Sequence, residues 1–508
     1  MRMVYNRKTN QARRTSAGAS FWRGALLWVM ALTWTACASA LQTSVSSEPK
    51  ALPLPEAVVA LVNARDADPQ NPAKTEAVIK AALEARRFTL AFDEAQRLRE
   101  LQPDSDIPLE LLGEACFGLR LFNQAADSYY AANQKVFSAS RAYRIGWILL
   151  SKGSKQKAQE YLSEAVSMAP DEWRLVELLV SAHTSPAGKQ GELEDFLARH
   201  PAHPEATAAL AKLQAGERPT LDKIVQGEGQ VIRVPINDAY EIPIKFNNLS
   251  IKTTLMMGDG LVLSAPAQVR LALIRAKEKR EVMDSHGNRG SARTVIVKSV
   301  KIGDLVLENV PAIVLDEQYT SKVTASIGIG RLAGYSLLID RKAERLEFHP
   351  HTLPTPKLSE HSTKLQCYKS GSSWMVEVGM TNLDTKHGVQ GLGSLQFGYQ
   401  NTVFHTPNIL EQRLGTLDTT QTVTMRGSLG YGKRVMVERM TLGFAGDTFV
   451  GFAADARRGN NKQGYFYATD LGQLQAFTPH LLIGRDVLYF YRFLLDTQSH
   501  MLHLERYE

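Results

Sequence analysis

Cysteine is scarce in this chain of 508 residues, which excludes folds that depend on cross-links or thiolate ligands. The three cysteines, Cys37, Cys116 and Cys367, form no CxxC pair and no cluster with histidine. Neither a disulfide framework nor a zinc site of ordinary ligand spacing is supported. We expect Cys116 and Cys367 to be buried free thiols, since an unpaired cysteine packs as a small apolar side chain.

The motifs of several enzyme classes are also missing. No lysine follows Gly258-Asp259-Gly260 at the spacing of a phosphate-binding loop, and neither GxSxG nor HExxH occurs. The 12 histidines are scattered, and the short-range pairs lack a third ligand. We therefore expect no metal and no cofactor.

Acidic residues are absent from residues 1–40, which hold six basic ones: Arg2, Arg7, Lys8, Arg13, Arg14 and Arg23. The formal charge of the chain is +7, so only +1 remains without this segment. The basic pI therefore gives no argument for a nucleic-acid partner.

The same segment predicts export. An apolar stretch, residues 24–36, follows the basic residues and is too short to span a bilayer comfortably. Ala38-Ser39-Ala40 has the small-x-small pattern of signal cleavage, whereas Thr35-Ala36-Cys37 resembles a bacterial lipobox that would lipidate Cys37. Both processing routes stay open. Either one predicts a periplasmic or cell-envelope protein, with membrane attachment if Cys37 is lipidated.

Residues 41–55 are expected to form a linker, and residues 56–216 carry a helical pattern that repeats every 33 to 34 residues. Matching small, large and proline positions recur in three units: Ala91, Ala95, Leu98 and Pro103; Leu112-Gly113, Ala125, Tyr129 and Ala132; Ile145-Gly146, Ala158, Leu162, Ala165 and Pro170. The pattern resembles the tetratricopeptide repeat, and three phased units favour it over an ordinary helical bundle. The resemblance implies a protein- or peptide-binding platform with no chemistry of its own.

Near Pro219 the apolar period changes from about 3.6 to 2, which predicts strands. Asn247-Asn248 suits a hairpin turn because Asn tolerates positive φ. Further strands are expected at 294–300, 303–308 and 311–315, with turns at Gly303-Asp304 and Asn309-Val310-Pro311.

The C-terminal half contains an internal duplication. Residues 255–266 and 395–407 each run from an apolar strand into a glycine turn, then an apolar pair and a proline. Residues 326–346 and 481–502 each give an apolar pair, a glycine, a short helical segment, a strand, an Asp turn and a closing strand. The same four elements thus occur twice in the same order.

The duplicated pattern resembles the retropepsin and pepsin-like aspartic peptidase fold over residues 228–508. We expect a multidomain chain: all-α tetratricopeptide-like repeats, then a mainly-β double-lobed peptidase-like domain with lobes at 217–358 and 359–508. Glycine-rich hairpins at 285–290 and 426–432 stand where that family has substrate-covering flaps. The alternative for each is a plain exposed turn.

The resemblance places the family's two aspartates at Met256 and Gln396, and neither side chain ionises near pH 7. The peptidase mechanism needs two adjacent carboxylates that share a proton. Asp259 has no partner acid in the second loop, and Asp340 and Asp496 are expected to be turn residues. The residues expected to line a binding site are Met256, Gly258, Asp259, Gln396, Gly398, Tyr399 and Tyr431.

The sequence therefore predicts an exported, non-catalytic protein that binds a protein or an extended peptide. Two alternatives stay open. One is an active aspartic endopeptidase that uses a non-standard acid, and the other is a structural protein of envelope assembly.

Overall fold

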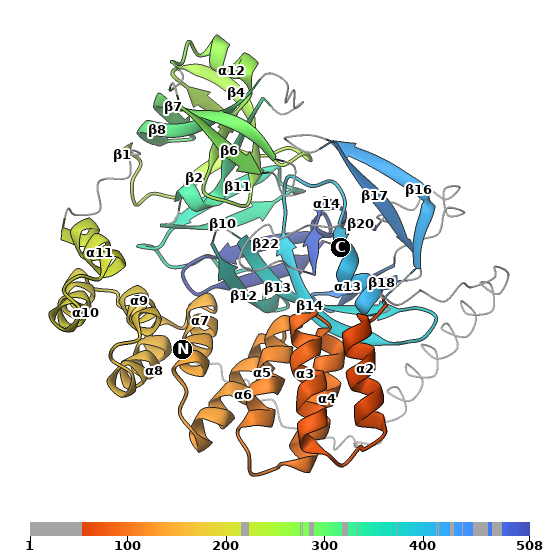
Figure 1. Cartoon of the computed structure of the whole chain (residues 1–508). Coiled ribbons are helices and arrows are strands. Elements are labelled where there is room, and N and C mark those ends of the chain that lie inside the picture. The colour runs from red at the N-terminus through yellow and green to blue at the C-terminus, as the bar shows by residue number, and fades with distance from the viewer. Residues whose placement is uncertain are drawn as a thin grey trace, which may run out of the picture. The chain divides into compact units, whose positions relative to one another are not determined.

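The computed structural model describes residues 53–507 except 215–222, 275, 277, 284–288, 317–323, 333, 372, 413, 415, 427–430, 439, 451–465 and 470–479. The expected export segment, with Cys37, lies outside these residues. Helices fill the described chain up to Gln214, and strands dominate from Lys223 on (Figure 1). Within the described part, no helix is long and apolar enough to cross a membrane.

The N-terminal region consists of consecutive antiparallel helices that pack against their neighbours in sequence. Their bounds are α2 (Glu56–Asp66), α3 (Pro72–Glu84), α4 (Phe88–Leu101), α5 (Ile107–Gly118), α6 (Phe122–Lys135), α7 (Ala139–Ser151), α8 (Lys155–Met168), α9 (Trp173–Ala182), α10 (Pro186–Arg199) and α11 (Pro204–Gln214). Helices α4, α6 and α8 begin at residues 88, 122 and 155, which gives spacings of 34 and 33 residues. The predicted repeat is confirmed.

Glycines let the two helices of a repeat approach closely. A Cβ on Gly113 of α5 would lie 2.6 Å from the ring of Tyr129 on α6, and one on Gly146 of α7 would lie 2.5 Å from Leu162 of α8. Tyr129 and Leu162 are fully buried. Pro103 and Pro170 follow the ends of α4 and α8, because proline cannot continue a helix.

Replacing Gly113 by Ala is expected to destabilise the protein by about 1–3 kcal/mol, because the new methyl group overpacks against the Tyr129 ring. Gly191→Ala in α10 is the matched control. No atom lies within 4 Å of its Cβ position, so the higher helix propensity of Ala should stabilise by about 0.5–1 kcal/mol. Urea unfolding followed by far-UV circular dichroism measures both. Equal effects of the two substitutions would contradict the interlocking.

The first lobe is built on an eight-stranded sheet in the order β1-β8-β5-β9-β4-β3-β7-β6. Its elements are β1 (Lys223–Gln226), β3 (Glu241–Phe246), β4 (Leu249–Met256), β5 (Leu261–Leu263), α12 (Ala265–Arg270), β6 (Lys279–Met283), β7 (Arg289–Ile302), β8 (Leu305–Leu315), β9 (Ala325–Gly328) and the 3₁₀ turn η1 (Ile329–Leu332). Strand β4 runs parallel to β9, and β5 runs parallel to β8.

The second lobe repeats this scheme. Its elements are β13 (Ser373–Asn382), β14 (Gly388–Leu395), β15 (Val403–His405), α13 (Thr406–Glu411), β16 (Thr416–Arg426), β17 (Tyr431–Glu438), β18 (Met440–Phe444), β19 (Asp447–Val450), β20 (Tyr467–Thr469), β21 (Leu481–Ile483) and α14 (Arg485–Leu488). Strand β14 runs parallel to β21 and β15 parallel to β20, so β14, β15, β20 and β21 correspond to β4, β5, β8 and β9. The predicted duplication is confirmed in strand order.

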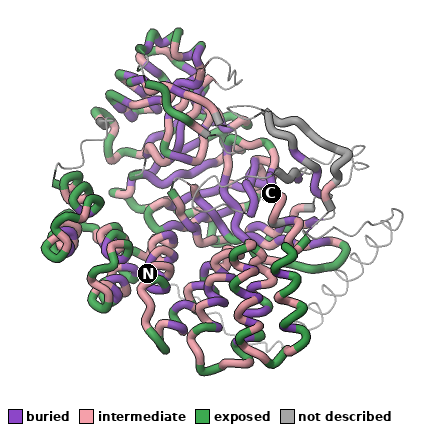
Figure 2. Tube along the Cα trace, viewed as in Figure 1, coloured by how far each residue is buried: buried purple, intermediate pink, exposed green. Residues whose placement is uncertain are grey.

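Six strands from both lobes form one continuous segment of sheet, in the order β12-β23-β22-β10-β11-β2. Their bounds are β2 (Ile232–Pro235), β10 (Tyr335–Asp340), β11 (Arg345–Pro350), β12 (Thr363–Ser370), β22 (Tyr491–Asp496) and β23 (Met501–Arg506). The lobes meet at β10 and β22, where Leu338 is opposite Leu494. One apolar core spans both lobes and includes buried residues of all six strands. Figure 2 colours the buried residues of the chain purple.

Two predicted turns are confirmed and one is wrong. Asn247 and Asn248 have positive φ in the β3–β4 hairpin, and Gly303 has positive φ between β7 and β8. The expected turn at 309–311 lies inside β8, where Pro311 is opposite Ile296. On its other side, β8 pairs with β1 at residues 306–308 and with β5 at residues 313–314. Pro311 lies between these two paired stretches, so the N–H that proline lacks is not needed for either pairing.

The helical repeats contact the second lobe through residues in or next to the turn inside each repeat. Thr89 N donates to Glu411 Oε1 at 3.3 Å, and Asn123 Nδ2 donates to Glu377 Oε1 at 3.1 Å. In the third unit Gln366 Nε2 donates to Lys152 O at 3.2 Å. Tyr368, Met375 and Leu392 of the lobe belong to the same apolar cluster as the buried residues of α3 to α7. Repeats and lobe therefore share a core.

Candidate functional site

Met256 and Gln396, the positions at which the sequence resemblance places the two peptidase aspartates, are equivalent in this fold. Met256 is the last residue of β4 and is opposite Gly328 of the parallel strand β9. Gln396 follows β14 directly, and its N–H donates to Ile483 O of the parallel strand β21 at 3.0 Å. Each position thus ends a strand that is paired with the apolar-apolar-glycine strand of its own lobe.

The loop after Met256 is held by backbone contacts that only glycine permits. Gly328 N donates to Gly260 O, and Gly330 N donates to Gly258 O, both at 2.8 Å. A Cβ on Gly328 would lie 2.2 Å from Gly258 O, and Gly258 has φ 137°. Asp259 is exposed, with its carboxylate next to Gly330. Among the described residues, no hydrogen bond or ion pair joins Asp259 to a second carboxylate.

The loop after Gln396 is held by a carboxylate that sequence reasoning missed. Asp486 accepts hydrogen bonds from Thr402 N at 3.0 Å and from Thr402 Oγ1 at 2.7 Å. Thr402 Oγ1 accepts from Gly484 N at 3.1 Å, and Arg485 N donates to Tyr399 O at 2.8 Å. Asp486 closely follows the glycine of the apolar-apolar-glycine element, but no local pattern pairs it with Thr402, which lies 84 residues away.

Burial raises the pKa of Asp486 to about 6, although its hydrogen bonds with Thr402 act in the opposite direction. Both carboxylate oxygens are occupied by Thr402, so this acid positions the loop. Tyr399 lies in the same loop, with the guanidinium of Arg434 5.5 Å from its ring centroid. Gly398 is exposed, and no atom lies within 4 Å of its Cβ position.

The side chains at the two equivalent positions are half-buried and carry no titratable group. Gln396 Nε2 donates to Ser394 Oγ at 3.3 Å, and Ser394 is buried. Met256 presents a thioether, a weak acceptor that holds no exchangeable proton. Gln396 therefore offers hydrogen-bonding groups, and Met256 offers an apolar, polarizable surface.

Tyr240 connects both loops, and no sequence pattern indicated this role. Its carbonyl accepts from Leu255 N, one residue before Met256, at 2.9 Å. Its ring stacks on Phe397, one residue after Gln396, with centroids 5.5 Å apart and planes 13° apart. The stack continues from Tyr240 to Tyr489 at 5.9 Å and from Phe397 to Phe493 at 5.2 Å. A first-lobe residue thus lies between rings of the second lobe.

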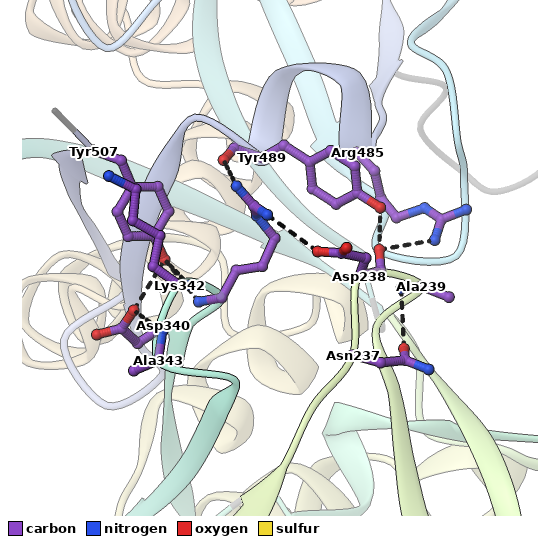
Figure 3. Close-up of polar contacts among 10 residues, drawn as sticks. Asn237, Asp238, Ala239, Asp340, Lys342, Ala343, Arg485, Tyr489 and Tyr507 are labelled. Carbon is purple, nitrogen blue, oxygen red and sulfur yellow. Dashed lines mark hydrogen bonds and ion pairs between the residues drawn. The ribbon is translucent and has the colours of Figure 1, made fainter.

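Figure 3 shows the polar contacts around Tyr489, at one end of this stack. The interlobe cluster, as we name it, consists of Asp238, Arg341, Arg485, Tyr489 and Tyr507. Asp238 O accepts from the Tyr489 hydroxyl and from Arg485 Nη1, the latter at 3.2 Å. Asp238 Oδ1 accepts from Arg341 Nη1 at 3.0 Å, and Tyr507 Oη accepts from Arg341 N at 2.7 Å. The cluster joins the β2–β3 and β10–β11 turns of the first lobe to α14 and the end of β23.

Several other predicted residues can now be placed. Asp340 Oδ1 accepts from Ala343 N, and Asp496 Oδ1 accepts from Gln498 N, both at 3.1 Å, so both are turn residues as expected. Tyr431 begins β17, but its side chain lies outside the described residues. The two glycine-rich tips, 284–288 and 427–430, lie outside them as well, although their flanking strands pair as hairpins.

Cys116 and Cys367 are buried free thiols, as predicted. Burial raises the pKa of the Cys116 thiol to about 12 and that of Cys367 well above its usual range, so neither is a reactive thiolate at neutral pH. Within the described part of the chain, no group of three or more His, Cys, Asp or Glu side chains could hold a metal ion.

Helix packing and duplicated strand order define the class. The chain combines all-α tetratricopeptide-like repeats with a mainly-β, double-lobed domain of aspartic-peptidase-like fold. No family model and no curated protein matches the sequence.

Each of the two regions is similar to solved structures. The helical region is similar to the MamA protein, with 20% identity over 32% of this chain and 85% of that chain at a TM-score of 0.26. It is also similar to YrrB, a TPR protein with an unusual peptide-binding site (13% identity, 32% and 84% coverage, TM-score 0.27). The β region is similar to the aspartic proteinase from Irpex lacteus (12% identity, 54% and 97% coverage, TM-score 0.36).

Proposed function

We propose that this chain is an exported protein that binds an extended peptide between its two lobes without cleaving it. The helical repeats would serve as a second protein-binding platform. Export is supported by the acid-free, basic segment 1–40 and its apolar stretch, residues 24–36. Signal cleavage after Ala40 and lipidation of Cys37 are the two routes to a periplasmic or envelope location.

One observation carries the non-catalytic part of the proposal. The two equivalent loops keep their supporting backbone contacts, yet Met256 and Gln396 occupy the positions that end β4 and β14. Splitting water by the peptidase route needs two carboxylates that share a proton. Residues 256–260 contain one acid, the exposed Asp259, and residues 396–402 contain none. A single exposed carboxylate supplies neither the shared proton nor the paired geometry.

The strands next to the loops support an apolar peptide as ligand. In β5, Leu261 and Leu263 enter the main core, whereas Val262 packs with Val282 and Ile313 in a small separate cluster. In β15, Phe404 enters the core, whereas Val403 packs with Leu482 and Tyr399. Both lobes thus place a small apolar cluster beside the equivalent loop. A peptide with apolar side chains on both sides of its centre would match this arrangement.

The test is saturable binding without cleavage. The full-length protein is titrated against an immobilised library of extended peptides, and bound peptides are then incubated with it between pH 3 and pH 7. We expect saturable binding of apolar peptides and no new peptide termini by mass spectrometry. Gln396→Ala should weaken binding about five- to tenfold, because a hydrogen-bonding amide is removed.

Gln390→Ala is the matched control, because Gln390 is an exposed glutamine of β14, the strand that leads to Gln396. It should leave affinity unchanged. Cleavage that is inhibited by pepstatin and lost in Asp259→Asn would show an active peptidase. An absence of both saturable binding and cleavage would overturn the proposal and leave the lobes a structural role in envelope assembly.

A further inference from the structure

Tyr240 contacts residues next to both equivalent positions. Its main chain is bonded to the residue before Met256, and its ring lies on the residue after Gln396. The ring is buried, with only 1% exposed, between Phe397 and Tyr489. Met257 and Phe397, the residues that follow the two equivalent positions, have no hydroxyl or amide side chain with which to bond across the lobes.

The interlobe cluster fixes the segment that carries Tyr240. Asp238, two residues earlier, is bonded through its carbonyl to Arg485 and Tyr489 and through its carboxylate to Arg341. The Arg341 guanidinium lies 4.9 Å from the Tyr489 ring centroid, and Arg341 Nη2 donates to Tyr489 O at 3.2 Å. The contacts of Asp238 with Arg341, Arg485 and Tyr489 therefore fix the chain two residues before Tyr240.

We propose that Tyr240 is a positioning residue that sets the separation and orientation of the Met256 and Gln396 loops. A rotation of one lobe against the other would pull the ring out of its stack and break the bonds of Asp238. The two lobes therefore keep one arrangement, in which an extended peptide meets both loops at once. The functional part of this inference rests on the proposed function, whereas the fixed lobe arrangement does not.

The buried hydroxyl of Tyr240 has no hydrogen-bond partner among the described residues, which gives a sharp pair of variants. Tyr240→Phe keeps the stacked ring and removes only this unpaired hydroxyl, whereas Tyr240→Ala removes the ring. The inference requires that Tyr240→Phe keeps the wild-type distance between the lobes and that Tyr240→Ala does not. Phe397→Leu removes the ring from the second-lobe side of the stack and serves as a replacement if Tyr240→Ala does not fold.

The experiment measures the distance between the lobes in the full chain. Spin labels are placed at Lys298→Cys and Thr448→Cys, both exposed, with Cys37→Ser as background and the buried Cys116 and Cys367 left in place. Double electron–electron resonance should give one narrow distribution for wild type and Tyr240→Phe. Tyr240→Ala and Phe397→Leu should broaden it about twofold, as expected when a packed contact between two bodies is lost.

Peptide affinity is the second readout. For Tyr240→Ala we expect roughly tenfold weaker binding, mostly through a faster koff, with no change for Tyr240→Phe. If wild type binds no peptide, the proposed function fails, and the distance distributions still decide whether Tyr240 fixes the lobes. An unchanged distribution in folded Tyr240→Ala or Phe397→Leu would overturn the inference.

Discussion

Acidification from pH 6.5 to pH 4.5 is expected to reduce the free energy of unfolding by about 2 kcal/mol through His480 alone. Burial, together with the charges of the neighbouring Arg120 and His405, lowers the pKa of His480 to about 3. Its Nδ1 accepts from Leu392 N at 3.1 Å, and its backbone N–H donates to Leu392 O at 2.9 Å. The imidazole thus ties β14, which leads to Gln396, to the start of β21.

The sign follows from the two pKa values. The folded value lies below the unfolded value of 6.5, so the unfolded chain binds the proton more readily. The contribution of neutral His480 to stability is complete above pH 6.5 and is lost as the pH falls toward 3. Each pH unit inside this window costs about 1.4 kcal/mol.

His480→Asn is the informative variant, because the Asn side-chain oxygen can accept from Leu392 N and cannot become charged. Urea unfolding of both proteins, followed by tryptophan fluorescence at pH 7.5, 6.5, 5.5 and 4.5, gives the difference in stability. The deficit of His480→Asn at pH 7.5 should shrink or reverse at pH 4.5. His361→Asn, at an exposed position, should show no such trend. A difference that is constant across the range would show that His480 does not titrate as its burial implies.

Phe122→Ala is expected to destabilise the helical repeats and the second lobe together, by about 3–5 kcal/mol. Phe122 is fully buried and packs its ring against Phe117 and Trp147 of the repeats at 5.3 and 5.5 Å. Its ring also packs against that of Tyr368 in β12, with the ring centroids 5.3 Å apart. The cavity would open at the boundary between the two regions, so neither side can close it without losing its contact with the other.

Two probes separate a coupled loss from a local one. Far-UV circular dichroism reports mainly on α2 to α11, and hydrogen exchange of the β12 amides reports on the lobe. Both should shift by the same free energy in Phe122→Ala. Tyr130→Ala on the same helix is the matched control, since Tyr130 is 51% exposed and surface substitutions usually stay within about 0.5 kcal/mol. Unchanged protection of β12 would show that the repeats unfold independently of the lobe.

The sequence alone predicted the features that are encoded locally. The repeat of small and large residues brings Gly113 against the ring of Tyr129, because both residues lie on helices of fixed pitch. The strand-then-glycine pattern at Met256 and Gln396 identified two equivalent loops, because strand periodicity and glycine turns depend on near neighbours. The error at 309–311 has a related cause. A proline normally ends a strand. Only the pairing of β8 with its neighbours shows that the strand continues through Pro311.

Other features depend on which distant segments come together. Thr402 meets Asp486, Tyr240 meets Phe397, and Phe122 meets Tyr368, each across at least 84 residues of sequence. Such contacts follow from strand order and from the docking of whole elements, so no local period announces them. The sequence by itself determined the two kinds of domain and the absence of acids at Met256 and Gln396. The tertiary structure alone decided what holds the two loops, because side-chain contacts between remote segments exist only after the sheets are paired.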